Sequence, residues 1–599
     1  MENRTSDNSN NKKGGSKPWD TIVDVVVVGS GAGALTASLR AHDLGLKTLV
    51  VEKTNQYGGT SAISGGGIWI PNNFQMQSMG IKDADEVAVD YIKRVIGEEP
   101  GDGRIEAYVA NAKKMLRYLE ENTRVRYEAQ SAYADYYPEL PGGMPGYRSM
   151  DPIPFHASKL GSEFENLRPT TPATLMLGRM AMTMKEARVL LCRGKGFLLT
   201  NMRIMWRYYR DIFWRMKSRR DRFLTLGNAL IAALRASMLD RDIPLWLNSP
   251  MESLVEENGQ VIGVVVNRNG KQVRVKARKG VIIGAGGFES NQAMREKYHP
   301  QPSQSLWSAA PEGINTGDGI QAGQNLGAAT ALMEHSWWAP TSHVEGETRS
   351  RAMFVERALP NCILVNKDGK RFMNEAAPYN DFGDGMYGTE SVPCWFVFDA
   401  QYRHKYPCGA LLPGYAVPDK AVPKRYKSFF QKAESLEALA EKIGVDAAGL
   451  QETVTSYNQY SAEGKDPEFG KGDSLFDRYY GDPNTTPNPC LGPLEKGPFY
   501  AVKVNIGDIG TKGGLVTDVD GQVLKEDGSP ISGLYAIGNT SASVMKQTYP
   551  GAGSTIGPAM TFGYLSANHI AQRQVDARTV KAGDVAAENT QENKNAVEA

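Results

Sequence analysis

A glycine-rich turn between a strand and a helix, near the start of the chain, restricts the fold more than any other feature. Residues 22–28 are a β-branched run, which predicts a strand, and Gly29-Ser-Gly-Ala-Gly-Ala34 follows at once. The stretch 35–44 predicts a helix, and 47–51 predicts a second strand that ends at Glu52. This order is typical of the first βαβ unit of a dinucleotide-binding α/β fold.

The glycines and Glu52 indicate how this turn would bind a dinucleotide. Gly29, Gly31 and Gly33, followed by Ala34, allow a tight turn and close backbone approach to a pyrophosphate at the helix N-terminus. Glu52 comes 23 positions after Gly29, where a carboxylate accepts hydrogen bonds from a ribose. A purely structural turn is the alternative, and the order of elements makes it the weaker one.

Later glycine-rich segments favour FAD over NAD. Residues 57–69 form a loop of glycines and hydroxyls that can wrap an extended dinucleotide and lie under an isoalloxazine ring. A nicotinamide site does not need such a loop. Residues 284–287 predict a strand end suited to close approach, and 553–557 predict a helix start. A helix N-terminus there would stabilise the negative charge of a reduced flavin.

Composition and cysteine spacing exclude other classes of protein. The chain has 68 Lys and Arg against 67 Asp and Glu, so no overall field attracts nucleic acid. Its five cysteines contain no C-x-x-C pair and its seven histidines show no metal-ligand spacing, so we predict no metal and a reducing compartment. The first 20 residues lack the apolar core of a signal peptide, and no apolar run is long enough to span a bilayer. We therefore expect a cytoplasmic protein.

With 599 residues, the chain is long enough for two large domains or three smaller ones. We predict an α/β protein in which a Rossmann-like FAD-binding domain is interrupted by an α+β substrate domain. The expected divisions are a disordered tail at 1–19, the first part of the FAD-binding domain at 20–304, the substrate domain at 305–499, the second part at 500–575 and a disordered tail at 576–599.

A segment at 180–222 predicts helices rich in basic and aromatic residues. From Lys185 to Arg222 there are 12 basic and three acidic residues, a local net charge of +9. Two interpretations remain open: a solvated helical face over buried aromatics, and an interfacial segment in peripheral contact with anionic lipid headgroups. The aromatic residues of the second interpretation are Trp206, Tyr208, Tyr209, Phe213 and Trp214.

Motifs spread over about residues 22–570 resemble one group of flavoproteins. The stretches 23–53, 58–71, 280–291, 315–319, 365–375 and 534–564 are similar to flavoproteins related to fumarate reductase, and more closely to 3-ketosteroid Δ1-dehydrogenases. Fumarate reductases bind a dicarboxylate with His and Arg. Here Ala339 stands where the His of their H-P-T motif would fall, and Pro378-Tyr379 occupies a region where relatives tend to have Arg. Aromatic residues in place of charges suit a flat apolar substrate.

The resemblance implies an FAD-dependent 1,2-desaturation of a 3-oxosteroid or sterone. In that reaction the C2 proton goes to a tyrosine, the C1 hydride goes to flavin N5, and a quinone or other external acceptor takes the electrons. The resemblance assigns the 3-keto oxygen to the Tyr549 hydroxyl and the Gly553 amide, and the base to Tyr379. Tyr136 is the supporting tyrosine we choose, with Tyr133 and Tyr137 as alternatives. No histidyl attachment site is visible, so non-covalent FAD is expected.

Those residue types suit the chemistry. A C–H bond next to a ketone is a weak acid unless two donors stabilise the developing enolate. Free tyrosine has a pKa of about 10, so a tyrosine base needs a neighbouring hydroxyl or a positive field. The alternatives are a 3-ketosteroid Δ4-(5α)-dehydrogenase and a flavin-binding protein without turnover.

The motifs and the resemblance together give the predicted FAD-binding residues. They are Gly29, Gly31, Gly33, Ala34, Glu52, Lys53, Gly59, Thr60, Ser61, Ser64, Gly65, Gly66, Gly67, Val255, Ala285, Gly286, Asp318, Gly538, Asn539, Ser554 and Ile556.

Overall fold

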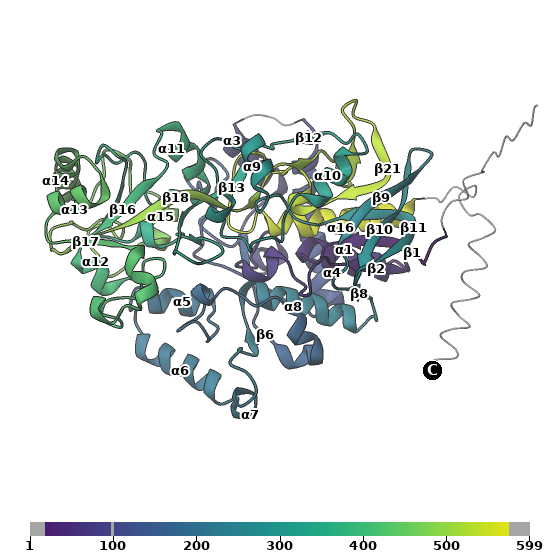
Figure 1. Ribbon diagram of the computed structural model, residues 1–599, viewed down its shortest axis with the longest axis horizontal. Helices are drawn as coiled ribbons and strands as arrows, with labels where there is room; N and C mark the ends of the chain where they lie inside the picture. Colours follow the sequence, from purple (N-terminus) through teal and green to yellow (C-terminus); the bar gives the residue numbers. More distant parts are fainter. Residues whose placement is uncertain (1–17, 98–100, 574–599) are drawn as a thin grey trace, which may run out of the picture.

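The computed structural model describes residues 18–97 and 101–573. Of the predicted tails, 1–19 and 576–599, only Pro18 and Trp19 lie within these ranges. The expected domain end at residue 575 lies outside them. Trp19 is not part of a free tail, because the guanidinium of Arg274 lies over its ring, 4.7 Å from the ring centre. An eight-stranded sheet occupies one end of the elongated molecule and a six-stranded sheet the other (Figure 1).

The eight-stranded sheet contains the βαβ unit predicted at the start of the chain. β1 (Thr21–Val28) lies between β2 and β11 and runs parallel to both. Val25, Val26 and Val27 are fully buried, as expected for a strand covered on both faces. The strand order is β20-β21-β10-β11-β1-β2-β8, and β9 pairs with β10. The bounds are β2 Thr48–Val51, β8 Leu245–Trp246, β9 Met251–Glu257, β10 Gln260–Arg268, β11 Lys271–Ile283, β20 Gln522–Leu524 and β21 Pro530–Ala536.

β9, β10 and β11 form an antiparallel meander at one side of this sheet. Asn258 and Gly259 join the first pair, Asn269 and Gly270 join the second, and all four have positive φ. Two consecutive residues with positive φ match the right-handed twist of a hairpin. β8, which precedes the meander in the chain, pairs with β2 in parallel.

The last helix of the described chain packs against the first. α1 (Ala32–Asp43) and α16 (Ile556–Gln572) cross where both carry glycine. A Cβ on Gly33 would lie 2.6 Å from the Ala559 carbonyl oxygen, and one on Gly563 would lie 2.6 Å from that of Gly33. Both glycines are therefore needed for the two helices to approach this closely.

The six-stranded sheet has the order β14-β13-β18-β16-β15, with β17 also paired to β18. The bounds are β13 Ser336–Ser342, β14 Arg351–Ala352, β15 Cys362–Val365, β16 Cys394–Phe398, β17 Gln431–Ala433 and β18 Phe499–Thr511. The sequence assigned residues from 500 onward to the returning FAD-binding half, whereas β18 is the central strand of this sheet. β18 pairs with three strands of the six-stranded sheet, and the chain rejoins the eight-stranded sheet only at β20.

Helices surround these sheets. In the region before the six-stranded sheet they are α2 Phe74–Ser78, α3 Asp85–Ile96, α4 Arg104–Asn122, α8 Leu226–Leu239, α9 Gln292–Tyr298 and α10 Asp318–Gln324. Around the six-stranded sheet they are α11 Phe382–Gly388, α12 Ala400–Lys405, α13 Leu436–Ile443, α14 Ala447–Glu463 and α15 Leu475–Tyr480. Smaller sheets pair β3 (Ile68–Trp69) and β4 (Tyr127–Ala129) with β5 (Ser149–Pro152), β6 (Phe155–His156) with β7 (Phe223–Leu224), and β12 (Thr330–Ala331) with β19 (Gly514–Leu515).

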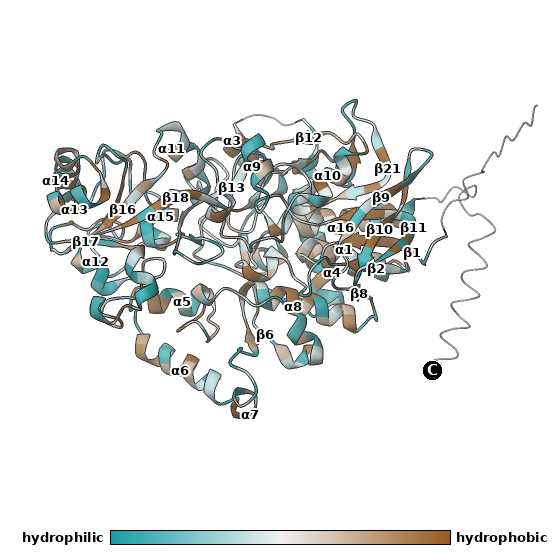
Figure 2. Cartoon of the chain, viewed as in Figure 1, coloured by the Kyte–Doolittle hydropathy of each residue, from teal (hydrophilic) through white to brown (hydrophobic). Residues whose placement is uncertain are grey.

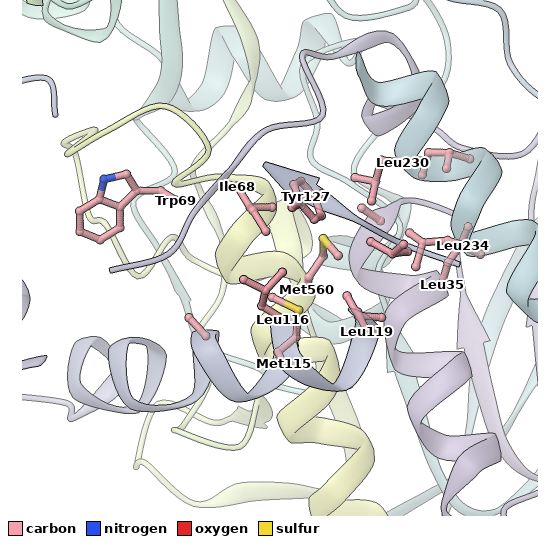
Figure 3. Close-up of a cluster of buried hydrophobic side chains, with 14 of the residues drawn as sticks. Leu35, Ile68, Trp69, Met115, Leu116, Leu119, Tyr127, Leu230, Leu234 and Met560 are labelled. Carbon is pink, nitrogen blue, oxygen red and sulfur yellow. The ribbon is translucent and has the colours of Figure 1, made fainter. Parts of the chain in front are cut away.

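The main core lies where four helices meet. Figure 3 shows Leu35 of α1, Leu116 of α4, Leu234 of α8 and Met560 of α16 pointing toward one another, with Ile68 nearby. All five side chains are fully buried. This core fixes the first and last helices together, and with them the two glycine-rich segments that the sequence assigned to the cofactor.

The helices predicted within 180–222 form a protruding segment. They are α5 (Met184–Leu191), α6 (Phe197–Tyr209) and α7 (Ile212–Arg215), and Figure 1 shows α6 and α7 at the lower edge of the molecule. None of the helices within 18–97 and 101–573 has both the length and the apolar character that crossing a membrane requires.

Candidate active site

The first glycine turn brings together three segments that lie far apart in the sequence. Gly29 has φ +102°, and a Cβ there would overlap the Gly284 carbonyl, so the ends of β1 and β11 meet without side chains. The amide of Ala32 donates to Ser61 Oγ at 3.1 Å. Gly31 lies beside the same hydroxyl. The turn, the loop and the end of β11 thus form one surface at the N-terminus of α1.

Glu52 lies at the edge of this surface. Its buried carboxylate accepts from Ser30 Oγ at 2.5 Å and from the Thr54 amide at 2.9 Å, so it is fixed beside the glycine turn. Lys53 and Asp318, predicted separately, form an ion pair at 2.9 Å. Lys53 Nζ also donates to Thr316 Oγ1, which connects the end of β2 to the start of α10.

The loop predicted to lie under the flavin leaves space at two of its glycines. A Cβ on Gly59 or Gly65 would meet no atom within 4 Å, whereas Gly66 packs against the backbone of Leu226 and Gly227. Thr60 Oγ1 accepts from Asn315 Nδ2 at 2.8 Å, and Ser64 Oγ donates to the Ser61 carbonyl at 2.8 Å. Gly67 lies beside Met150 of β5. The loop is fixed at its ends and open between them.

A cavity lies at the N-terminus of α16. Three predicted cofactor residues, Gly538, Asn539 and Ser554, contribute to its wall. Arg104 and Lys512 also line it, and both are buried. The sequence did not identify these two cations, because each comes from a segment without a cofactor motif.

The remaining predicted cofactor residues lie around these surfaces. Ala34 is buried in α1, and Ala285 and Gly286 follow β11, with the Gly286 carbonyl accepting from Thr540 Oγ1 at 2.9 Å. Ile556 is the first residue of α16, and Val255 lies partly buried in β9.

These residues fit FAD. Gly59 and Gly65 leave open space, and the cavity at α16 is lined by glycine, hydroxyl and cationic residues. Arg104 Nε is buried without a hydrogen-bond partner among the described residues, as expected of a donor in a site that takes a polar ligand. The glycine turn and the cavity each lie at a helix N-terminus, which favours negative charge.

The three tyrosines singled out in the sequence form one buried cluster. Tyr136 follows β4, Tyr379 begins the short helical turn Tyr379–Asp381, and Tyr549 precedes α16. The ring centres are 5.6 Å apart for Tyr136 and Tyr379, 5.0 Å for Tyr136 and Tyr549, and 5.4 Å for Tyr379 and Tyr549. The Tyr136 amide donates to the Pro550 carbonyl at 3.0 Å, which anchors it beside Tyr549.

The neighbours of Tyr136 make other contacts. The Tyr133 hydroxyl bonds to that of Tyr480, and the Tyr137 hydroxyl donates to Asp381 Oδ1 at 2.5 Å. The Tyr136 hydroxyl is buried and has no hydrogen-bond partner in the described part of the chain. Among the three alternatives, Tyr136 is thus the one whose ring contacts both Tyr379 and Tyr549.

Burial dominates the electrostatics of the cluster. It raises the pKa of Tyr379 well above the usual 10, Tyr549 adds to the rise, and the Tyr136 hydroxyl acts in the opposite direction. Burial raises the pKa of Tyr136 in the same way. The Tyr549 hydroxyl accepts from Thr555 Oγ1 at 3.3 Å. Gly553, at φ +103°, lies against Ile68 and Trp69 with no room for a side chain, and no bond from its amide is found among the described residues.

Sequence reasoning missed the aromatic wall of the cluster. Trp337 packs on Tyr549 at 4.9 Å, Phe354 on Tyr379 at 4.7 Å and Phe476 on Tyr136 at 4.7 Å, measured between ring centres. The Trp337-Trp338-Ala339 stretch carried a signal, since it stands where relatives bind a carboxylate. Phe354 and Phe476 lie outside any motif. Trp337, Phe354 and Phe476 thus form an aromatic chamber around the three tyrosine rings.

The basic aromatic segment also differs from its prediction. Trp206, Tyr209 and Phe213 are exposed as expected, but Tyr208 is buried and donates to the Arg219 carbonyl, and Trp214 donates to the Arg220 carbonyl. Tyr208 and Trp214 are therefore wrong as headgroup contacts. Brown in Figure 2 marks apolar residues in α6 and α7, and other apolar residues of this segment are exposed. They are Leu198, Leu199, Met202, Met205, Ile212 and Met216.

Comparisons with known proteins agree with this architecture. The family model described as an FAD binding domain matches residues 24–556. The chain is 43% identical to a 3-oxosteroid 1-dehydrogenase of Comamonas testosteroni, over 90% of this chain and 95% of the relative, and 42% identical to one of Mycobacterium tuberculosis, over 92% and 98%. A crystal structure of 3-ketosteroid Δ1-dehydrogenase from Sterolibacterium denitrificans, in complex with 1,4-androstadiene-3,17-dione, superposes with a TM-score of 0.89 at 51% identity and covers 92% of this chain and 99% of that one.

Proposed function

The chain belongs to the FAD-binding flavoproteins and, within them, to the 3-oxosteroid 1-dehydrogenases, and from this we propose that it desaturates the C1–C2 bond of a 3-oxosteroid. The observation that carries the proposal is the buried cluster of Tyr136, Tyr379 and Tyr549. Tyr549 lies on the same segment as Gly553, whose amide has no hydrogen-bond partner among the described residues. A 3-keto oxygen requires two donors, and this segment supplies a hydroxyl and an amide four residues apart.

In this proposal Tyr549 and Gly553 stabilise the charge that develops on the ketone oxygen. Tyr379 takes the proton from C2, and the Tyr136 hydroxyl, which has no other partner in the described chain, stabilises the Tyr379 oxygen as it changes charge. The chamber of Trp337, Phe354 and Phe476 excludes water, so each of these interactions is stronger than it would be in solvent.

FAD supplies the hydride acceptor when it is bound. Gly29, Gly31 and Ser61 would hold its pyrophosphate end and Glu52 its ribose, because they surround the N-terminus of α1. Gly65 would leave room under the ring, and Gly538, Asn539 and Ser554 would line the far end at α16. We further propose that the six-stranded sheet belongs to an inserted domain that contributes Tyr379 and interrupts the FAD-binding domain.

We propose two partners besides the steroid. The first is a quinone or other external acceptor for the electrons. The second is a membrane surface, contacted peripherally by the protruding segment α5–α7. One exposed face of α6 consists of apolar and aromatic residues that recur every three or four positions. They are Leu198, Met202, Met205, Trp206 and Tyr209. On the opposite face, Ile204 and Tyr208 pack on Met180.

Charge favours an anionic surface as the partner of that face. Five cationic residues are exposed around it: Arg193, Lys195, Arg210, Lys217 and Arg219. The Arg210 guanidinium lies 4.6 Å from the centre of the Trp206 ring. A contiguous apolar face rimmed by cations is the arrangement that binds anionic headgroups. A surface of this kind brings the enzyme to a substrate that itself partitions into bilayers.

The decisive experiment is anaerobic mixing with a 3-oxo-4-ene steroid. A dehydrogenase loses its oxidised-flavin absorbance at about 450 nm on mixing, whereas a flavin-binding protein without turnover keeps it. A second substrate separates the two regiochemistries: a saturated 5α-3-oxosteroid should give the 1-ene. Formation of the 4-ene would instead assign the chain to Δ4-(5α)-dehydrogenation.

A further inference from the structure

Lys512 is a buried residue that contacts the segment leading into the tyrosine cluster. Its Nζ donates to the carbonyl oxygens of Gln547 and Thr548, each at 2.6 Å. The side chain is fully buried and forms no ion pair among the described residues. Gln547 and Thr548 immediately precede Tyr549, so Lys512 is bonded to the two peptide groups that lead into the proposed keto-binding residue.

The Gln547 carbonyl connects the two proposed catalytic tyrosines. Besides the bond from Lys512, it accepts one from Asn380 Nδ2 at 3.1 Å. Asn380 directly follows Tyr379. One oxygen atom thus joins the backbone that carries the base to the backbone that carries the keto-binding hydroxyl, and Lys512 fixes that oxygen from a third segment.

A second contact reaches Tyr549 through its side chain. Lys512 Nζ lies 4.4 Å from the centre of the Trp337 ring, and that ring packs on Tyr549 at 4.9 Å. The Trp337 indole N–H donates to Asn539 Oδ1 at 3.2 Å, so the ring is held in place. Lys512 therefore limits the movement of Tyr549 on both the backbone and the ring side.

An apolar side chain of similar length could not replace these contacts. Two buried carbonyls would lose their donor, and a buried unpaired polar group is costly. Burial lowers the pKa of Lys512 well below its usual range, and Asp381 and Asp384 act against that shift. A neutral amine still carries two hydrogens, one for each carbonyl. The two bonds thus persist in either protonation state.

We propose that Lys512 is a positioning residue that sets the place of the Tyr549 hydroxyl relative to Tyr379 by holding the Gln547 and Thr548 carbonyls. The inference rests on the proposed function, in which Tyr549 binds the 3-keto oxygen. A displacement of about 1 Å in such a group is enough to slow a reaction about 10²-fold. The loss cannot exceed that caused by removing the Tyr549 hydroxyl itself.

The test compares Lys512→Met with Lys546→Met in the FAD-loaded protein. Lys546 lies directly before Gln547, but its Nζ pairs with Asp102 at 3.0 Å instead of with the two carbonyls. We expect Lys512→Met to slow anaerobic flavin reduction about 10²-fold, and Lys546→Met to stay within about threefold of wild type. Titration with a 3-oxo-1,4-diene steroid, followed by the change in flavin absorbance, should show a weaker Kd for Lys512→Met as well.

Combination with Tyr549→Phe separates positioning from general damage. If Lys512 acts through the Tyr549 hydroxyl, Lys512→Met should change little in the Tyr549→Phe background. Losses that multiply would overturn the inference, as would a Lys512→Met variant that matches Lys546→Met. If Lys512→Met fails to retain FAD, Asn380→Ala tests the same carbonyl. We then expect Asn380→Ala to change little in the Tyr549→Phe background, and losses that multiply would again overturn the inference. A wild-type flavin that no 3-oxosteroid reduces would reject the proposed function instead.

Discussion

The rings of Tyr379 and Tyr549 meet edge to face, with their centres 5.4 Å apart and their planes at 79°. They lie 170 positions apart in the chain, one at the start of a helical turn and the other before α16. Tyr136 packs nearly perpendicular to both, at 71° and 70°. Three rings in this arrangement leave their hydroxyls as the only polar groups that they bring to the chamber, so each hydroxyl can be tested separately.

Replacement of Tyr549 by Phe should slow flavin reduction by about 10²–10³-fold, because one of the two donors to the ketone is lost while the Gly553 amide remains. The dependence of the rate on pH should stay as in wild type, since the removed hydroxyl only polarises the carbonyl. Stopped-flow reduction from neutral to alkaline pH measures both quantities. A rate equal to wild type would contradict the assignment of Tyr549.

Replacement of Tyr379 by Phe should cost about 10²–10⁴-fold and abolish the alkaline rise. Because the pKa of Tyr379 lies well above 10, the ionised fraction in wild type increases tenfold for each pH unit across the accessible range. The wild-type rate should therefore increase with pH. If Tyr379→Phe kept both the rate and this increase, Tyr136 would become the candidate base.

Tyr136→Phe should leave stability unchanged or slightly improved while slowing flavin reduction. The hydroxyl that it removes is buried without a partner in the described chain, so the folded state loses no bond. Tyr133→Phe is the matched control, because it breaks the bond to Tyr480 and should lower the Tm. The assignment fails if Tyr136→Phe lowers the Tm as much as the control and reacts at the wild-type rate.

Gly65→Ala should weaken FAD binding at least about tenfold, or 1.4 kcal/mol, without destabilising the FAD-free protein. A Cβ there meets no protein atom within 4 Å, so any penalty comes from the cofactor. Gly388→Ala, at the end of α11, adds a methyl group with equal room and serves as control. Apo-protein Tm and FAD titration separate the two effects. Equal FAD affinity in all three proteins would place the cofactor elsewhere.

Glu289→Gln should stabilise the protein at pH 8 but not at pH 5. Burial raises the Glu289 pKa to about 7, helped by Asp508 and opposed by the Asn315 hydrogen bond. A carboxyl with a raised folded pKa stabilises below its unfolded value of about 4.3 and loses that contribution as pH rises through about 7. The Tm difference between variant and wild type should therefore grow with pH. The control is Glu312→Gln, because Glu312 is exposed. A Tm difference for Glu289→Gln that did not change with pH would contradict the raised pKa of Glu289.

Changing Leu198, Trp206 and Phe213 together to Ser should abolish sedimentation with vesicles of anionic phospholipid. Phe213 is 85% exposed and Trp206 63%, so the changes remove surface apolar area and no core contact. Activity on a dissolved steroid should not change. The matched control is Leu412→Ser, an exposed apolar residue outside α5–α7. Wild-type protein that fails to sediment with such vesicles would contradict the membrane proposal.

Local patterns predicted the first βαβ unit and its glycine turn because each pattern is short. The glycines of residues 29–33 and the asparagine–glycine turns act within a few residues, where backbone sterics decide the conformation. The choice of FAD and of the family agrees with the comparisons. The place of β18 near the expected boundary at 500 could not be read in the same way. Its partner strands β13, β16 and β17 put it in the six-stranded sheet, and its own sequence does not indicate them.

Long-range contacts explain what the sequence could not predict. Tyr136, Tyr133 and Tyr137 have the same local composition, and what distinguishes them is the partner that each meets: Tyr549, Tyr480 and Asp381 respectively. Tyr208 and Trp214 were placed on the surface because helical aromatics beside arginines resemble an interfacial pattern. Hydrogen bonds to the Arg219 and Arg220 carbonyls turn them inward instead.

The crossing of α1 and α16 has a consequence for synthesis on the ribosome. The first helix finds its glycine partner only when residue 563 has been made, and β11 gains its second parallel neighbour, after β1, only with β21. At about 5–20 residues per second, the roughly 530 residues between Gly33 and Gly563 take about 27–106 s to translate. Throughout that interval the nascent chain exposes the apolar face of α1 and contains only half of the nucleotide site. We therefore expect the yield of folded protein to depend on protection of this face until the cofactor can bind.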